Sequence, residues 1–403
     1  MHYYGWKIPT DSISRDSLSQ RFQDIGAEIN FTSHKKDSAE INFKVGLDYN
    51  YFAGQKPLNG AEAKWKPMEN YFALTSNAWY KLGKEIYSAD FNVKYNGYQY
   101  GDLYDTNAFV LDSGVQNMNT VVNLKPTITT YLMDNRVKAT IGLDFTLDNS
   151  EKTKAYVYPV VEAKYSLFND ILIPYAGARG GLKQMTYKSL VGLNEFVLPN
   201  VELRNEHTAI DLYGGIKGTL SKRMSFNLCA SFARIKDKLF FVTDTIYSVG
   251  NKFNLTYDSL NITTFEGSLS YQLAEKLKID GIGRFYSYSL EHNTFAWNLP
   301  QWQAILRGSY NLYDKFLVNL DLNFEGGRYA LVYAMEDDVK LENGQYAKQL
   351  GLIADVNLSV EYRYNKRISA FAQVNNLASQ RYMRWYNFPV QPFQFMGGIT
   401  FRF

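Results

Sequence analysis

Large apolar residues alternate with polar or small ones over long stretches of this chain. In the C-terminal segment QFMGGITFRF, this alternation continues to the last residue, Phe403. Successive side chains of a strand point to opposite faces, so a period of two predicts a strand with one apolar and one polar face. The same period recurs in runs of about ten residues, such as INFKVGLDYNY from Ile41 and FLVNLDLNFE from Phe316.

Short polar turns join these runs into pairs. They lie near Gly83, Asp134, Asn169, Ser221, Glu275, Asp314 and Asn365. Tight turns of this kind predict antiparallel hairpins. Longer, irregular connections separate the hairpins, beginning near Tyr100, Tyr187 and Arg328. The sequence therefore predicts an all-β chain of about 16 to 18 antiparallel strands, with short turns at one end and long loops at the other. The least certain strand is the opening HYYGWKI.

Two architectures fit such a pattern, a transmembrane β-barrel and a soluble β-sandwich of several domains. A tilted strand needs about 9 to 11 residues to cross a bilayer, whereas strands of globular proteins usually have about five or six. No Ser/Gly/Pro linker or low-complexity tract divides the sequence. We therefore predict one domain over residues 1–403, and we expect a closed barrel because closure removes every exposed sheet edge.

Charged residues gather on the polar faces of the predicted strands. In a barrel of about sixteen or more strands that face is the inner one. The predicted lumen-lining residues are Asp48, Lys94, Asp144, Glu162, Lys164, Glu266, Arg284, Arg307, Asp321, Glu361, Arg363 and Arg402. Because both signs of charge are mixed, a strongly ion-selective pore is disfavoured. The mixture fits a surface that packs against a plug or lines a broad aqueous passage.

Composition and charge exclude several other classes of protein. No stretch approaches the roughly 20 apolar residues of a membrane helix. The net charge of +3 is small for 403 residues and the basic residues are dispersed, so there is no footprint for nucleic acid. The N-terminal MHYYGWKIPTDS lacks the basic and apolar regions of a secretory signal.

Catalytic and metal-binding patterns are not found in the sequence. The histidines at positions 2, 34, 207 and 292 are far apart and have no metal-ligand spacing. Cys229 is the only cysteine and falls on a polar strand face, where an inert thiol is the expected reading. Neither G-x-S-x-G nor H-E-x-x-H occurs. We therefore expect no enzyme and no cofactor.

The long loops carry candidate contacts for an extracellular ligand, namely Phe196, Phe295, Trp297 and Asp337. The rings of the segment FAWNLPQW suit stacking on a sugar or a hydrophobic ligand, and the alternative is an interfacial aromatic girdle. The acidic residues around Asp337 offer oxygen ligands for Ca²⁺ or for cation-bridged lipopolysaccharide, and the alternative is solvated loop charge.

From Ile353 to Phe403 the sequence resembles the C-terminal end of TonB-dependent receptor barrels, especially those of Bacteroidetes-type bacteria. An N-L-x-x-x-R-Y pattern falls on Asn376, Leu377, Arg381 and Tyr382, and the last strand ends on an aromatic residue. In that family a terminal aromatic helps the barrel-assembly machinery to recognise the last strand, which implies an assembly signal at Phe401 and Phe403. The segment LPNVELRNE is also similar to the N-P-x-L-K-x-E stretch that precedes a mid-barrel strand in these receptors.

Two features depart from the family pattern. The usual Pro-Gly-Arg before the last strand is replaced by Val390-Gln391-Pro392, and no plug domain or TonB-contacting segment precedes the first predicted strand. The resemblance therefore implies an N-terminally incomplete part of a 22-stranded barrel in the outer membrane of a Gram-negative bacterium.

The function that this resemblance implies is uptake of a nutrient or metal complex. The implied partners are outer-membrane lipid and lipopolysaccharide, the barrel-assembly machinery, a small-molecule substrate and TonB, the last through an absent N-terminal region. Two alternatives stay open, a plugless diffusion porin and a structural or assembly component of an envelope complex.

Overall fold

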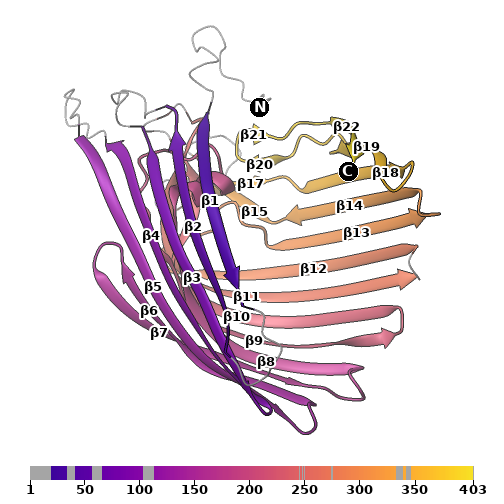
Figure 1. Cartoon of the computed structure of the whole chain (residues 1–403). Helices are drawn as coiled ribbons and strands as arrows, with labels where there is room; N and C mark the ends of the chain where they lie inside the picture. Colours follow the sequence, from indigo (N-terminus) through magenta and orange to yellow (C-terminus); the bar gives the residue numbers. More distant parts are fainter. Residues whose placement is uncertain are drawn as a thin grey trace.

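Seventeen strands of the chain form a single antiparallel sheet (Figure 1). The computed structural model describes residues 20–33, 41–56, 66–102, 113–244, 246, 248, 250–273, 276–332, 339–341 and 346–402. The strands of the sheet are β1 (Phe22–Thr32), β2 (Asn42–Gly54), β3 (Met68–Leu82), β4 (Glu85–Asp102), β5 (Ser113–Leu132), β6 (Val137–Asn149), β7 (Thr153–Tyr165), β8 (Leu172–Lys183), β9 (Glu206–Ser221), β10 (Met224–Thr243), β11 (Phe253–Leu273), β12 (Leu277–Leu290), β13 (Trp302–Leu312), β14 (Phe316–Gly326), β18 (Ile353–Arg363), β19 (Ile368–Asn375) and β22 (Gln394–Phe401). The predicted all-β class and the predicted strand number are confirmed. The opening HYYGWKI lies outside the described residues.

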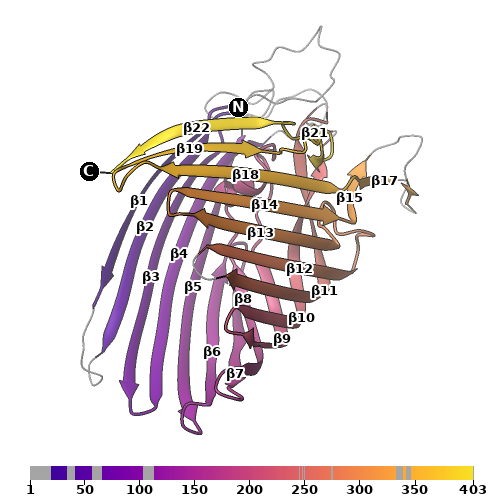
Figure 2. The ribbon, with the colours of Figure 1, turned by 90° about the vertical axis from the view of Figure 1, so that its right-hand side faces the viewer.

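The sheet is twisted and curved into a barrel wall, in which each strand pairs with the next one along the sheet (Figure 2). Short turns join β3 to β4, β5 to β6, β7 to β8, β9 to β10, β13 to β14 and β18 to β19, as predicted. Gly83 has a φ of +59° with open space around it, and Asp134, Asn169 and Asp314 also have positive φ. Gly, Asn and Asp tolerate this conformation best, which explains why the turns are visible in the sequence. In the turn between β11 and β12, Ala274 and Glu275 lie outside the described residues.

The alternation of the sequence separates the sheet into two chemically different faces. One face exposes large apolar side chains, among them Ile141 at 64% and Ile399 at 78% of their full surface. The other face carries the charged and amide residues, and the long loops fold onto it. We call these the outer and the inner face. So large an apolar surface is unfavourable in water and matches the lipid-facing side of a membrane barrel.

Within the described residues, no helix has both the length and the apolar character needed to cross a membrane.

The two edge strands of the sheet, β1 and β22, are not paired with each other in the described part of the chain. The closed barrel that we expected is therefore not formed by these strands alone. In an antiparallel sheet whose strands follow one another, the first and the seventeenth strands run in the same direction, so a direct pair between them would be parallel and would break the antiparallel order.

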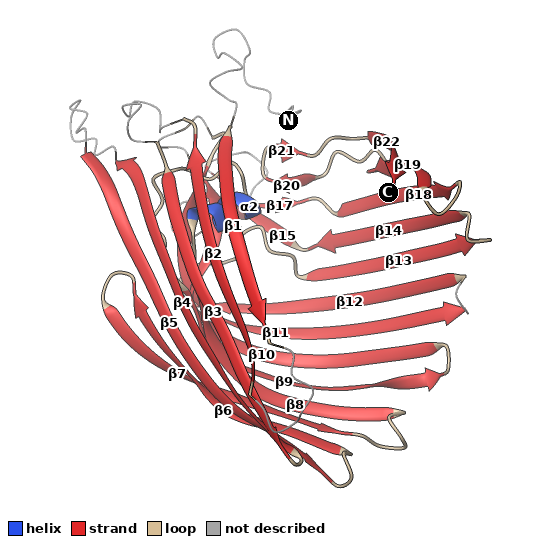
Figure 3. Ribbon diagram, viewed as in Figure 1, coloured by secondary structure: helices blue, strands red, loops and turns tan. Residues whose placement is uncertain are grey.

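The remaining elements belong to the long loops at one end of the wall. They are the helix α2 (Tyr187–Leu193), a small sheet of β15 (Arg328–Val332), β16 (Val339–Lys340) and β17 (Tyr346–Leu350), and the hairpin of β20 (Met383–Trp385) and β21 (Phe388–Pro389) (Figure 3). Strands such as β10 and β11, with 20 and 21 residues, are longer than a bilayer requires. Their loop-side ends exceed the length that a bilayer requires and provide a surface on which the loops pack.

Candidate ligand chamber

Charged side chains on the inner face are largely paired across neighbouring strands. The Arg284 Nε lies 2.6 Å from a carboxylate oxygen of Glu266, directly opposite on β11. Arg307 and Asp321 occupy opposite positions on β13 and β14, with 3.6 Å between Nε and Oδ1. Pairing of opposite charges cancels most of their long-range field. The inner face is therefore polar without being strongly cationic or anionic.

All the predicted lumen-lining residues fall on the inner face of the strands. Asp48 lies on β2, Lys94 on β4, Asp144 on β6, Glu162 and Lys164 on β7, Glu266 on β11, Arg284 on β12, Arg307 on β13, Asp321 on β14, Glu361 and Arg363 on β18, and Arg402 directly after β22. Lys164 contacts Glu162 at 2.6 Å, and Arg363 contacts Glu361 at 3.2 Å. Whether this surface meets water or a plug stays a prediction.

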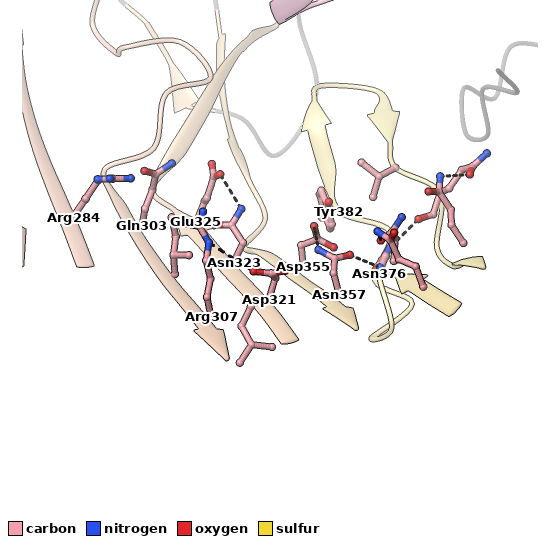
Figure 4. Close-up of a pocket in the computed structure, with 17 residues that line it drawn as sticks. Arg284, Gln303, Arg307, Asp321, Asn323, Glu325, Asp355, Asn357, Asn376 and Tyr382 are labelled. Atoms are coloured by element: carbon pink, nitrogen blue, oxygen red, sulfur yellow. Dashed lines mark hydrogen bonds and ion pairs between the residues drawn. The ribbon is translucent and has the colours of Figure 1, made fainter. Parts of the chain in front are cut away.

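A cavity of about 780 Å³ lies between the inner face of β12–β14, β18, β19 and β22 and the loop of residues 376–393 (Figure 4). We call it the chamber. Amide side chains dominate its lining: Gln303, Asn323, Asn357, Gln373, Asn375, Asn376, Gln391 and Gln394. The charged residues there are Arg284, Arg307, Asp321, Glu325 and Asp355. Alternation explains the set, because inward positions on neighbouring strands meet side by side.

The loop of residues 376–393 forms the roof of the chamber, and Asn376 fixes its shape. The Asn376 Nδ2 donates to the carbonyl oxygens of Gln380 and Gln391, each at 2.8 Å, and its Oδ1 accepts from the Gln380 N–H at 3.1 Å. The Asn376 N–H in turn donates to Asn357 Oδ1 at 3.0 Å. The first residue of the N-L-x-x-x-R-Y pattern, Asn376, is therefore buried and holds the loop in place through these hydrogen bonds.

Arg328, at the start of β15, holds the same roof from another side and was not singled out by the sequence. Its guanidinium, only 2% exposed, donates to the carbonyl oxygens of Arg384 at 3.0 Å, Met383 at 2.8 Å and Gly351 at 3.3 Å. Burial lowers the pKa of Arg328 from its ordinary value. An isolated arginine in a loop offers no periodic signal, which is why sequence analysis missed it.

Tyr382 projects from the roof into the chamber. Burial, followed by the nearby Asp355 carboxylate, raises the pKa of Tyr382 to about 12. Its hydroxyl is therefore protonated at neutral pH and can donate a hydrogen bond. Tyr382 is the last residue of the N-L-x-x-x-R-Y pattern, so the first residue of that pattern holds the roof and the last one lines the chamber.

A second loop, residues 184–205, packs on the inner face near β2, β4, β10 and β11. The buried Glu69 carboxylate on β3 accepts from the N–H groups of Tyr187 and Lys188 in the first turn of α2. At the end of the loop, Asn205 exchanges two hydrogen bonds with Asn119, at 2.8 and 3.0 Å. Buried polar groups paired in this way hold a loop in one position.

The loop residues predicted to contact a ligand lie mainly inside the loop packing. Phe196 is 7% exposed within the apolar cluster of the 184–205 loop, and Trp297 is 2% exposed in a second cluster with Leu331 and Phe240. Phe295 stacks on Tyr329 with 4.2 Å between ring centroids. Loop folding has buried Phe196 and Trp297 and has half-buried Phe295, so these rings do not form a free stacking surface or a membrane girdle. Their contact with a ligand stays a prediction that this packing does not favour.

The remaining predicted site residues are Asp337, Phe401 and Phe403. Asp337 and Phe403 lie outside the described residues. Phe401 ends β22 with its ring exposed on the outer face, and an assembly role for it stays a prediction. In the described part of the chain, no three His, Cys, Asp or Glu side chains are grouped so as to hold a metal ion.

Comparison of the fold with solved structures finds similar proteins, whereas comparison of the sequence finds none. No family model matches this sequence, and no curated protein matches it. Among solved structures, the copper transporter OprC matches with a TM-score of 0.65 and 13% identity over 95% of this chain and 66% of its own. The pyoverdine outer membrane receptor FpvA from Pseudomonas aeruginosa, bound to pyoverdine, matches with a TM-score of 0.62 and 15% identity. The match covers 95% of this chain and 62% of FpvA. The siderophore receptor PirA from Acinetobacter baumannii matches with a TM-score of 0.68 and 12% identity. The match covers 95% of this chain and 63% of PirA.

These neighbours are barrels of the TonB-dependent receptor type, and they are named as receptors and transporters. The present chain spans about two thirds of their length or less. At 12 to 15% identity the likeness establishes the fold. This chain therefore has the fold of a receptor-type β-barrel of the Gram-negative outer membrane.

Proposed function

We propose that this chain is the barrel wall of a TonB-dependent receptor, located in the outer membrane of a Gram-negative bacterium, that takes up a nutrient or metal complex. The observation that carries the proposal is the chamber on the inner face, roofed by residues 376–393 and backed by an apolar outer face. A wall with lipid on one side and a loop-covered polar cavity on the other suits capture of a solute at the cell surface.

The direction of the edge strands supports a larger barrel. Because β1 and β22 run the same way, only an odd number of further strands can close the sheet in antiparallel order. Five more strands would satisfy this condition and give the barrel of 22 strands that the sequence resemblance implies. In this proposal residues 1–403 form one barrel domain, and TonB acts through a region outside this chain. Outer-membrane lipid, lipopolysaccharide and the barrel-assembly machinery are its other proposed partners.

The proposal is tested in the native host by deleting the gene that encodes this chain. We expect the protein in the outer-membrane fraction, and we expect uptake of its ligand to stop both in the deletion strain and after collapse of the proton gradient with a protonophore. Uptake that persists without the gradient would favour the diffusion porin. Location in the outer membrane without any uptake defect, together with stoichiometric co-purified proteins, would favour a structural or assembly component.

A further inference from the structure

The short turns lie together along one end of the barrel wall and share a composition that ligand uptake does not explain (Figure 1). Seven of them are described in whole or in part, and six place a large apolar residue two or three positions before a lysine or arginine. These pairs are Leu82 and Lys84, Met133 and Arg136, Leu220 and Lys222, Leu273 and Lys276, Tyr313 and Lys315, and Tyr364 and Lys366. A composition repeated in separate hairpins indicates a common environment for the turns.

The cations of these turns are exposed and are not neutralised by the protein. We call them the rim cations: Lys84, Arg136, Lys222, Arg223, Lys276, Lys315, Lys366 and Arg367. Within the part of the chain that the structure describes, none of them is in an ion pair. At the loop end of the wall, by contrast, Lys188 pairs with Asp24 and Lys238 with Glu206, each at 2.9 Å. The short-turn end therefore carries an uncompensated positive charge.

The carboxylates of the same turns do not offset this charge. The described ones are Glu85, Asp134, Asp170 and Asp314. Asp170 accepts a hydrogen bond from the Ser166 hydroxyl, and Asp314 accepts from Asn311 Nδ2 at 2.6 Å. Asp134, Asp170 and Asp314 all have positive φ, which aspartate tolerates better than most residues. These acids therefore shape the turns and leave the cations available to a partner.

Tyrosine side chains locate the membrane interface beside the rim cations. On the outer face, the last turns of the wall carry Tyr80, Tyr87, Tyr165, Tyr271, Tyr310 and Tyr362. Tyrosine is enriched at the headgroup level of membrane proteins. Lys84 lies three residues from Tyr87 and Lys366 lies four from Tyr362, so these cations are within about 14 Å of the tyrosine level along the strand. Long lysine and arginine side chains at this depth reach lipid headgroups.

Three turns also expose a bulky residue in a strained backbone conformation. Met133, Phe168 and Tyr313 have φ values of +51°, +53° and +53°, where Gly, Asn or Asp would be easier. The Tyr313 side chain is 81% exposed. Water gives such side chains no stabilising contact, whereas the boundary between headgroups and acyl chains does. A soluble acidic partner would explain the cations and leave these exposed apolar groups unexplained.

Unpaired cations, exposed apolar side chains and a neighbouring tyrosine level match the chemistry of an anionic lipid surface. We propose that the rim cations bind the phosphate groups of anionic phospholipids in the leaflet beside the short turns. On the periplasmic side, which we expect these turns to face, that leaflet is the inner one. The inference depends on the membrane-barrel fold and is independent of which ligand the barrel takes up.

The test is electron paramagnetic resonance of the full chain in phosphatidylcholine vesicles, with spin-labelled phosphatidylglycerol or spin-labelled phosphatidylcholine as the probe lipid. The spectra measure how strongly each probe associates with the protein surface. We expect phosphatidylglycerol to associate more than about twofold more strongly at about 50 mM salt and nearly equally at about 500 mM, because salt screens exposed charges.

Two triple variants assign the lipid preference to the short turns. The rim variant combines Lys222→Gln, Arg223→Gln and Lys366→Gln, and it should lose at least about half of the preference for phosphatidylglycerol. The matched control combines Lys44→Gln, Lys138→Gln and Lys217→Gln on the inner face, which removes the same charge away from lipid and should keep the preference. Circular dichroism and heat-dependent gel mobility report whether each variant is folded. If the rim variant does not fold, the salt dependence of the wild type decides.

Four results would overturn the inference. They are equal association of the two probes with the wild type, a preference that persists at high salt, an unchanged preference in the folded rim variant, and an equal loss in the inner-face control. Equal association of the probes, together with sedimentation of the reconstituted chain on purified peptidoglycan, would assign the rim cations to an anionic cell-wall polymer instead.

Discussion

The Phe196 ring lies 4.1 Å from the Phe388 ring between centroids, although the two residues come from loops at opposite parts of the sheet. Phe196 belongs to the loop between β8 and β9, and Phe388 belongs to β21 beside the edge strand β22. Phe253 at the start of β11 lies 5.5 Å from the same Phe388 ring. The two loops therefore meet above the inner face through aromatic contacts, and the roof of the chamber packs against the 184–205 loop.

This contact predicts that Phe388→Ala loosens both loops. Removing the ring eliminates its packing against Phe196 and Phe253, which should lower the local stability of the roof by about 2 to 3 kcal/mol, given its partial exposure. Hydrogen exchange followed by mass spectrometry should show faster exchange in residues 184–205 and 376–393. The control is Phe393→Ala, whose ring is exposed. Unchanged exchange in both loops would mean that the roof stands without this contact.

The assignment of the faces predicts unequal costs for adjacent arginine substitutions on β14. Leu320 points to the outer face, so Leu320→Arg places a charge in hydrocarbon and should cost about 2 to 4 kcal/mol near the bilayer midplane. Asn319 points inward and makes one long hydrogen bond of 3.3 Å to Ser359, so Asn319→Arg should cost less than about 1 kcal/mol. Urea unfolding in lipid vesicles measures both variants, and the reverse ranking would exchange the two faces.

The ends of the wall predict which positions are accessible from outside the cell. Glu151, in the turn between β6 and β7, lies at the loop end, and Lys366 lies in the short turn between β18 and β19. With Cys229 replaced by serine, Glu151→Cys should react with a membrane-impermeant maleimide on intact cells, and Lys366→Cys should react only after lysis. Both side chains are exposed, so accessibility to the reagent is matched. Labelling of Lys366→Cys alone on intact cells would invert the topology.

Glu69 predicts how the 184–205 loop responds to substitution. Glu69→Ala removes the acceptor for two N–H groups of α2, and each hydrogen bond to a charged group contributes about 1.5 to 3 kcal/mol. Amide exchange in residues 184–205 should therefore accelerate, whereas exchange in β13 and β14, which do not contact this loop, provides the internal control. An unchanged loop would show that its apolar cluster suffices to hold it.

The same carboxyl predicts a pH dependence. Burial, the dominant cause, raises the pKa of Glu69 above its ordinary 4.5. A group with a raised pKa in the folded state binds its proton more tightly there than in the unfolded state, so its contribution is complete below about pH 4.5 and falls as pH rises through the folded pKa. The advantage of the wild type over Glu69→Ala should thus be larger at about pH 4 than at about pH 8. Loop exchange rates measured at both values check the sign, and an advantage that grows with pH would contradict it.

The sequence by itself determined the strands, the turns and the two faces. Alternation places Leu320 outward and Asn319 inward whatever surrounds them, because side-chain direction in a strand is a local property of the backbone. The turns at Gly83 and Asp314 were also predicted from the sequence, because few residue types adopt a positive φ easily. The resemblance of the last fifty residues to a receptor barrel agrees with the fold, although no family model detects it.

Only the tertiary structure decided what the loops do. Phe196 and Trp297 carry the same sequence signal whether they face a ligand or a loop core, and only packing against distant segments buries them. Arg328 holds carbonyl groups more than fifty residues away, which no local period encodes. The chamber likewise depends on register, because it forms where inward amides of adjacent strands come level beneath a loop. The direction of each side chain along a strand is set within a few residues. The packing of the roof and the pairing of charges across strands are set by contacts between residues far apart in the chain.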